Sequence, residues 1–81
     1  MYKPLIELKL KEQAEVISFE GGQTMGRRLE SMGIRQGKII SRISSQLIRG
    51  PVIISVDGHQ TAIGRGMAAK LIVKPAESNG L

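Results

Sequence analysis

His59 is the only histidine of this 81-residue chain, and it stands beside Asp57 in the stretch DGHQ. A transition-metal site takes three or four ligands, and this stretch offers two. The chain has no cysteine, so it lacks thiolate ligands and a cysteine nucleophile, and a Ser-His-Asp triad would depend on this single imidazole. We therefore predict a protein that is not an enzyme, with no catalytic residue, no cofactor and no metal site. Weak surface binding of a transition metal at His59 stays open as an alternative.

A second chemical pattern is the run GRGMAA at residues 64–69, which matches the G-x-G-x-x-A fingerprint of dinucleotide-binding loops. Such a loop must open the helix of a βαβ unit and be followed about 20 positions later by an acidic residue. Only 12 residues follow Ala69, so neither the second parallel strand nor the acid has room. We predict a tight connection instead, with Ala68 packed under the last strand.

Basic residues dominate the body of the chain. The net charge is +5, divided into −1 for residues 1–20, +7 for residues 21–76 and −1 from Glu77. Such a charge attracts nucleic acid, acidic lipid or an acidic protein surface without choosing among them. Small barrels that bind nucleic acid usually add aromatic stacking platforms, and the aromatic residues here are Tyr2 and Phe19 alone. A small basic SH3-like barrel that binds nucleic acid is therefore the alternative function, not the leading one.

Four basic residues lie in the stretch RRLESMGIRQGKII, namely Arg27, Arg28, Arg35 and Lys38. In a helix each residue is turned by about 100° from the one before. Relative to Met25, Arg28 flanks the apolar stripe, whereas Arg27 points almost directly away. We expect Arg28 to act as a structural anchor through hydrogen bonds to barrel carbonyls. The other three residues are candidates for contact with a partner's acidic surface.

A loop is expected in the stretch SSQLIRGP, where Leu47 and Ile48 fall outside any clear strand alternation. These two side chains either cap the barrel or, if exposed, form a partner contact, since exposed apolar patches mark interaction sites. With the neighbouring Arg49 they complete the set of candidate partner-binding residues.

One short helix is predicted from residue 24 onward. Met25, Leu29 and Met32 recur at the spacing of a helical stripe. Thr24 can serve as the N-cap. At the other end Gly33 suits a left-handed residue, and the next residue, Ile34, can fold back onto the helix in a Schellman motif.

Apolar alternation predicts about five short strands, at residues 14–19, 38–44, 52–56, 61–63 and 71–73. Asp57 and Gly58 suit a two-residue hairpin turn, and the leucines of residues 5–10 are expected to cover one end of the core. Closure into a barrel would bury the apolar face and remove sheet edges. The prediction is a mainly β fold, a small, partly open SH3-like barrel with one short α-helix inserted after the first strand.

The domain organisation follows from length and composition. Residues 1–75 are expected to form a single domain, and residues 76–81 a flexible C-terminal tail. The charged N-terminal stretch MYKPLIELKLKEQAE offers neither a signal-peptide core nor a membrane span. We therefore expect a cytoplasmic protein.

The order and spacing of these pieces resemble the FeoA family, over about residues 4–74. The resemblance rests on PLIEL, on RRLESMGIRQGKII, which fits the pattern R-x-L-x-x-x-G-[ILM]-x-x-G-x-x-[IV], on the Gly-Pro pair of RGPVIISVDG, and on AIGRGMAAKLIV. We expect a structural role for Arg28, Leu29, Gly33, Gly37 and Pro51; of these, Leu29, Gly33 and Gly37 occupy fixed positions of the pattern, and Pro51 belongs to the Gly-Pro pair.

The resemblance implies an SH3-like barrel that acts as a non-catalytic accessory protein of bacterial ferrous iron uptake. Its implied partner is the cytoplasmic part of the FeoB iron permease, which would bring the protein to the inner face of the cell membrane. Assembly into a homo-oligomer stays open. Two departures stand out. Lys11 and Glu12 occupy a turn that is often acidic or Pro-Gly. Arg49 replaces a residue that is often small or acidic, and if its loop contacts the permease, partner choice is expected to differ.

Overall fold

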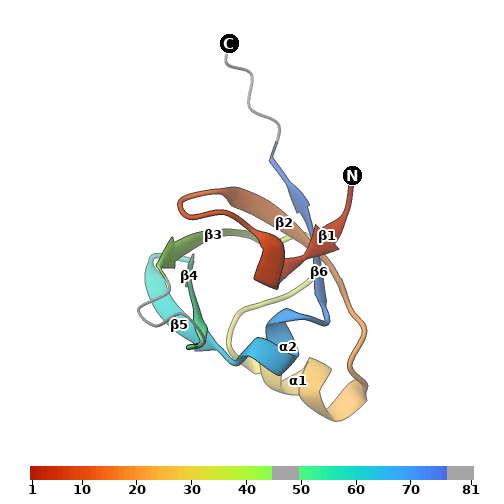
Figure 1. Ribbon diagram of the computed structural model, residues 1–81. Coiled ribbons are helices and arrows are strands. Elements are labelled where there is room, and N and C mark those ends of the chain that lie inside the picture. Colours follow the sequence, from red (N-terminus) through yellow and green to blue (C-terminus); the bar gives the residue numbers. More distant parts are fainter. Residues whose placement is uncertain (45–49, 77–81) are drawn as a thin grey trace.

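The computed structural model describes residues 1–44 and 50–76. Within them one antiparallel sheet of six strands curls around an apolar core, in the order β1-β6-β2-β3-β4-β5 (Figure 1). The strands are β1 (Lys3–Pro4), β2 (Gln13–Phe19), β3 (Ile39–Ser44), β4 (Val52–Val56), β5 (His59–Ile63) and β6 (Leu71–Pro75). The helices are a 3-10 turn η1 (Leu5–Glu7), α1 (Gln23–Ser31) and α2 (Arg65–Ala68).

The predicted mainly β barrel with a short inserted helix is confirmed. Among the described residues there is one strand more than expected, because Lys3 and Pro4 pair with Val73 and Ile72 of β6. Helix α1 therefore follows the second strand rather than the first. The sheet runs on past β6, since the Ala76 N–H donates to the Gln13 carbonyl at 2.8 Å.

The core follows the predicted alternation. Val52, Ile54 and Val56 are buried on one face of β4, and Ile63 of β5 is buried opposite Val52. The end of the core is covered by η1, whose neighbour Leu8 is buried, whereas Leu10 is 59% exposed. The expectation that all the leucines of residues 5–10 cover the core is therefore wrong for Leu10, because it lies at the corner of a tight turn.

Helix α1 ends as predicted but begins earlier. At its end the N–H groups of Gly33 and Ile34 donate to the carbonyls of Glu30 and Leu29, each at 3.0 Å, and Gly33 has φ 87°. These are the two hydrogen bonds of a Schellman motif. At its start the N-cap is Gly22, not Thr24. The Gly22 carbonyl accepts the first helical hydrogen bond, so the helix includes Thr24.

Two further turns place the strands around α1. Gly37, with φ 90°, donates its N–H to the Val16 carbonyl at 2.8 Å and so ties the turn after the helix to β2. Asp57 and Gly58 have φ 53° and 85°, the left-handed pair of a type I′ hairpin. The glycine run at residues 64–69 forms the short helix α2 with Ala68 fully buried. It is a tight connection, as predicted.

Candidate partner-binding surface

An open groove of about 580 Å³ lies between β2 and α1. The buried or half-buried apolar side chains that line it come from strands β2 and β6, from helix α1 and from the turn after α1, so the floor depends on the assembled barrel. The lining apolar residues are Val16, Ile17, Phe19, Leu29, Ile34 and Leu71. The polar rim consists of Arg27, Glu30, Arg35 and Gln36.

Two glycines lie against the Phe19 ring, which lines this groove. A Cβ on Gly21 would lie 2.3 Å from Cζ of Phe19, so the aromatic ring occupies the space where a side chain would stand. Gly26 lines the groove from within α1, and a Cβ there would lie 3.7 Å from the same ring. Glycine inside a helix costs about 1 kcal/mol relative to alanine. The helix accepts this cost at Gly26, and as a result no side chain projects from this position over the groove.

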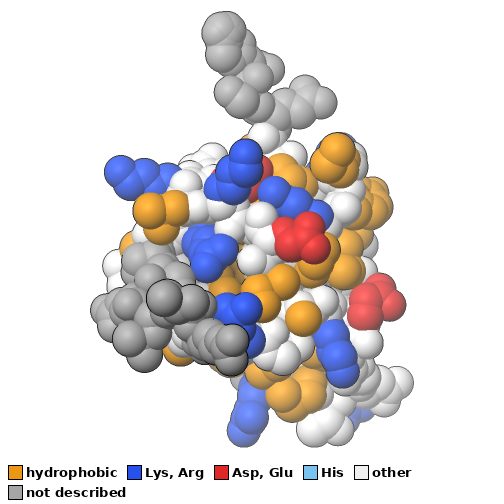
Figure 2. Space-filling view, viewed as in Figure 1, with side chains coloured by type: hydrophobic (Ala, Val, Ile, Leu, Met, Phe, Trp, Pro, Cys, Tyr) orange, Lys and Arg blue, Asp and Glu red, His pale blue; other side chains and the backbone are white. Residues whose placement is uncertain are grey.

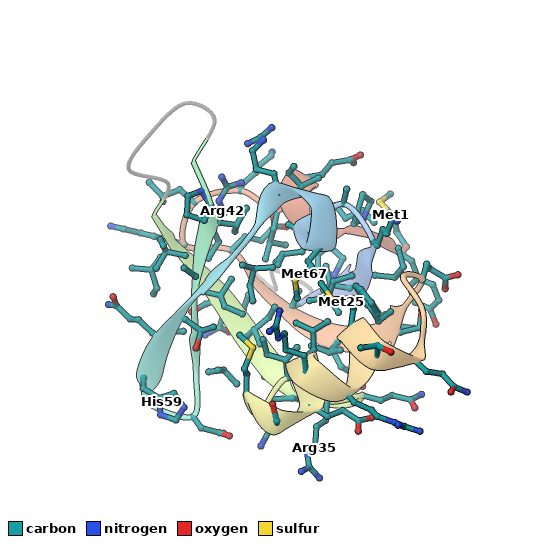
Figure 3. All side chains as sticks on the ribbon, turned by 90° about the horizontal axis from the view of Figure 1, so that it is seen from below. Met1, Met25, Arg35, Arg42, His59 and Met67 are labelled. Atoms are coloured by element: carbon teal, nitrogen blue, oxygen red, sulfur yellow. The ribbon has the colours of Figure 1, made fainter. Side chains whose placement is uncertain are left out.

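Arg27 and Arg35 stand on the rim of the groove, and both side chains are exposed. Figure 3 shows Arg35 reaching away from the barrel beneath α1. Arg27 was expected to point away from the apolar stripe, and it does lie off the core. The groove, however, runs along that outer flank of α1, so a side chain that turns away from the core still overhangs it.

A second hollow of about 590 Å³ adjoins the groove, with Arg35 and Gln36 lining both. Here Ile39 is 53% exposed, and Lys38 Nζ lies 3.0 Å from Asp57 Oδ2. The predicted free cation Lys38 is therefore paired. Because both side chains are exposed, this ion pair contributes little to stability and can exchange for another acidic group.

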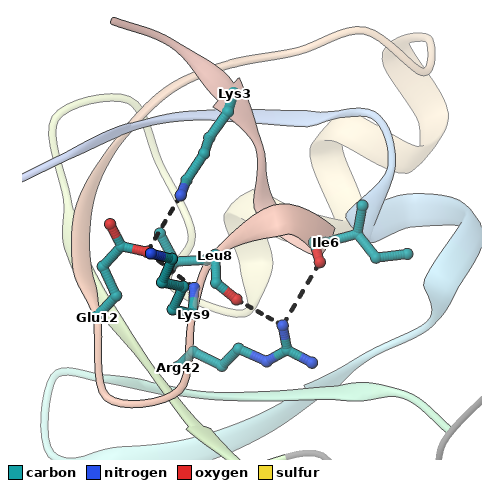
Figure 4. A network of polar contacts seen from close by, with 6 residues as sticks. All are labelled: Lys3, Ile6, Leu8, Lys9, Glu12 and Arg42. Atoms are coloured by element: carbon teal, nitrogen blue, oxygen red, sulfur yellow. Dashed lines mark hydrogen bonds and ion pairs between the residues drawn. The ribbon is translucent and has the colours of Figure 1, made fainter.

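The arginine side chain that donates hydrogen bonds to barrel carbonyls is not that of Arg28, as predicted, but that of Arg42. Arg28 is exposed, and among the described residues its guanidinium makes no hydrogen bond to a barrel carbonyl, so the prediction is wrong. Arg42 of β3 makes this contact instead. Its Nη1 donates to the carbonyls of Ile6 and Leu8, at 3.4 and 2.5 Å (Figure 4). The error arises because the helical wheel places Arg28 beside the apolar stripe but cannot show where unpaired carbonyls lie.

Glu12 completes the network around this N-terminal segment. Its Oε1 accepts from the Lys9 N–H at 2.8 Å and from Lys3 Nζ at 3.2 Å (Figure 4). The Lys9 N–H, and after it the Lys3 ammonium, lower the pKa of the Glu12 carboxyl below its ordinary value, against the opposing effect of burial. Lys11 next to it has φ 66°, a left-handed conformation that is unusual for a lysine.

The loop candidates Leu47, Ile48 and Arg49 lie outside the described residues. Just after them Gly50 is buried, and Pro51, which directly precedes β4, is exposed.

On the face formed by η1 and α2, Lys and Arg side chains are spread among apolar ones (Figure 2). His59 is exposed at the tip of the β4–β5 hairpin, away from Arg42 (Figure 3). In residues 1–44 and 50–76 no three His, Asp or Glu side chains come together as a metal-binding group.

This architecture places the protein in the class of small antiparallel barrels with an inserted helix. The zinc-complexed FeoA of Stenotrophomonas maltophilia, described as a procaryotic SH3 domain protein, has the same fold. It superposes with a TM-score of 0.74 at 23% identity over 88% of each chain. A crystal structure of an iron uptake regulatory protein (FeoA) superposes with a TM-score of 0.84 at 36% identity, over 94% of this chain and 99% of that one.

The sequence gives the family directly. The FeoA domain model matches residues 3–75. A protein of Methanocaldococcus jannaschii, named "Putative Fe(2+) transport protein A", is 43% identical over 77 residues, which are 95% of this chain and 92% of that one. The chain therefore belongs to the FeoA family, as its resemblance predicts. No helix among the described residues is long and apolar enough to cross a membrane.

Proposed function

We propose that this protein is a non-catalytic accessory factor of ferrous iron uptake that binds the cytoplasmic portion of a FeoB-type permease. Family membership supports the link to iron transport. The observation that carries the proposed contact is the groove between β2 and α1, with its apolar floor and with Arg27 and Arg35 on its rim. The protein is then cytoplasmic and reaches the inner face of the membrane through its partner.

The groove has the composition of a docking site for a short segment of another protein. Binding energy in such sites comes mainly from a few anchors that fill a desolvated pocket, surrounded by a polar rim. Here the half-buried Phe19 and Ile17 offer apolar contact, while the two arginines favour an acidic segment. Charges on a rim act mainly on orientation and on the rate of association.

The contact can be tested by measuring binding of the purified cytoplasmic portion of the permease. The double variant Arg27→Glu, Arg35→Glu is expected to raise Kd at least about tenfold, because rim attraction becomes repulsion. Gly26→Gln is expected to weaken binding similarly, since it places an uncharged side chain over the groove without changing the net charge.

Arg28→Glu is the matched control. It is matched to the single variant Arg27→Glu, because it makes the same charge change in the same helix, but Arg28 does not line the groove. It should leave Kd within about twofold, the scale of a rim charge that makes no direct contact. An equal loss with Arg28→Glu would show that only net charge matters and would reject the groove.

Two further measurements separate the remaining candidates. Unchanged binding in the double variant Leu47→Asp, Ile48→Asp would remove that loop from the contact. For the nucleic-acid alternative, a salt titration against oligonucleotides is decisive, because phosphate neutralisation gives a steep loss of affinity with salt. No binding at low salt would end that alternative.

A further inference from the structure

Strand β5 lies at one end of the sheet order, with β4 as its only strand neighbour among the described residues (Figure 1). The opposite end is β1, which consists of Lys3 and Pro4. A short strand that carries a lysine and a proline is poorly suited to pair with another strand. β5 has five residues and contains no Lys, no Arg, no Asp, no Glu and no Pro. Among residues 1–44 and 50–76, the sheet therefore has one protected edge and one edge that is open to pairing.

The backbone groups that face this open edge can be named from the register. His59 pairs with Val56 across the two-residue turn, so it exchanges both hydrogen bonds with β4. The same holds for Thr61 and Ile63, because hydrogen-bonded pairs alternate along an antiparallel ladder. Gln60 and Ala62 therefore point their N–H and C=O groups outward. In residues 1–44 and 50–76 these groups have no backbone partner.

The outward-facing backbone groups of β5 can pair with the same groups of β5 in a second copy of the chain. When two copies of β5 lie antiparallel with Thr61 facing Thr61, Gln60 of each copy faces Ala62 of the other. Both outward-facing residues are then used, and each pair exchanges two hydrogen bonds, about four in all. A shift of the register by two residues would bring only one such pair into place. The two-fold register centred on Thr61 is therefore the best one available.

Charges beyond the strand favour the same register. The net charge of +5 opposes association of two copies, but β5 itself contains no Lys, Arg, Asp or Glu. Gly64 is still extended, with φ −58° and ψ 150°, so Arg65 follows directly after the paired segment. In the two-fold register Arg65 lies nearest the hairpin turn of the partner subunit at both ends, and Asp57 in that turn can exchange its weak, exposed ion pair with Lys38 for one with Arg65. Each copy thus places Arg65 at one end of the paired segment and Asp57 at the other, so that opposite charges meet at both ends of the interface.

We propose that this protein forms a homodimer through antiparallel pairing of β5 with β5 of a second copy. The six-stranded sheet then continues across the two-fold axis. The groove between β2 and α1 lies elsewhere in the sheet order, so this dimer leaves the proposed permease contact free. The inference does not depend on the proposed function.

Sedimentation velocity tests the proposal with the full chain, from about 10 μM to about 1 mM, a range that spans the affinities of small interfaces. The wild-type protein should shift from one chain to two as the concentration rises. In the same range, amide hydrogen exchange of Gln60 and Ala62 should slow at least tenfold, because both N–H groups become bonded. A wild-type protein that stays monomeric throughout would overturn the proposal.

The decisive variant is Ala62→Pro, which removes one outward N–H while leaving the bonds to β4 intact. It should raise the dimer Kd at least tenfold. Ala62→Thr is the matched control, since it keeps the N–H at the same position and suits a strand, and it should dimerise like the wild type. An Ala62→Pro protein that is folded and still dimerises would reject β5 pairing.

Arg65→Glu gives a test that does not touch the strand backbone and holds even if the proline variant does not fold. It places two carboxylates opposite each other at both ends of the interface. The dimer Kd should rise at least tenfold at low salt, and the difference should shrink as salt screens it. A dimer unaffected by Arg65→Glu would contradict the register centred on Thr61.

Discussion

Nη1 of Arg42 lies 2.5 Å from the carbonyl oxygen of Leu8, a residue 34 positions earlier in the chain. The same nitrogen also donates to the Ile6 carbonyl. A half-buried guanidinium on β3 thus holds η1 and the turn after it against the barrel end. The backbone of Arg42 reinforces this contact, because its carbonyl accepts from Lys11 and its N–H donates to Glu12.

Arg42→Met should destabilise the fold by about 1–3 kcal/mol, because it keeps the aliphatic stem but leaves two carbonyls without their charged donor. Urea denaturation measures this loss. Arg28→Met, the same change at an exposed helix position, should stay within about 0.5 kcal/mol of the wild type. Equal effects of the two variants would contradict the assignment of Arg42 as the anchor.

The stability of the N-terminal segment should depend on pH through Glu12. The pKa of its carboxyl is lowered in the folded state from 4.5, so its stabilisation is complete above the unfolded value. It is lost as the pH falls through the lower folded value. Glu12→Gln should therefore be less stable than the wild type at neutral pH, with a gap that closes in acid. Denaturation across pH 7 to about pH 2 checks this, and Lys3→Met should reproduce part of the effect.

Two glycines should respond to alanine with opposite signs. Gly33→Ala should cost about 1–2 kcal/mol, because the end of α1 requires φ 87° at this position. Gly66→Ala in α2 should gain about 0.5–1 kcal/mol, since its φ is not positive and an added Cβ meets open space. Thermal and urea denaturation of both variants give the comparison. A stabilising Gly33→Ala would show that the helix end tolerates another conformation.

Lys11→Gly should stabilise the protein by about 0.5 kcal/mol. It removes a left-handed conformation that costs a side-chain-bearing residue about 1–2 kcal/mol, offset in part by the greater freedom of glycine in the unfolded chain. Lys9→Gly is the control, because Lys9 has no positive φ, and it should destabilise by about 0.5–1 kcal/mol. If both variants lose stability alike, strain at Lys11 is not significant.

Features that depend on neighbours in the chain could be predicted from the sequence. The helix end at Gly33 and the hairpin at Asp57 and Gly58 each need only a few consecutive residues, because positive φ and apolar spacing are local requirements. The buried face of β4 follows from its alternation for the same reason. Even here the prediction for the start of α1 is wrong, since Gly22 and Thr24 are both acceptable caps.

The buried strand faces, the helix end at Gly33, the hairpin turn at Asp57 and Gly58, and the family could be predicted from the sequence. Each of them depends on a short pattern of residues that are close together in the chain. Only the tertiary structure decided that Arg42 rather than Arg28 reaches unpaired carbonyls, and that Arg27 and Arg35 share one groove rim. It alone also decided that β5 remains an edge. The physical reason is that each of these features joins segments far apart in the chain, and a side chain's partner is fixed only when the barrel brings those segments together.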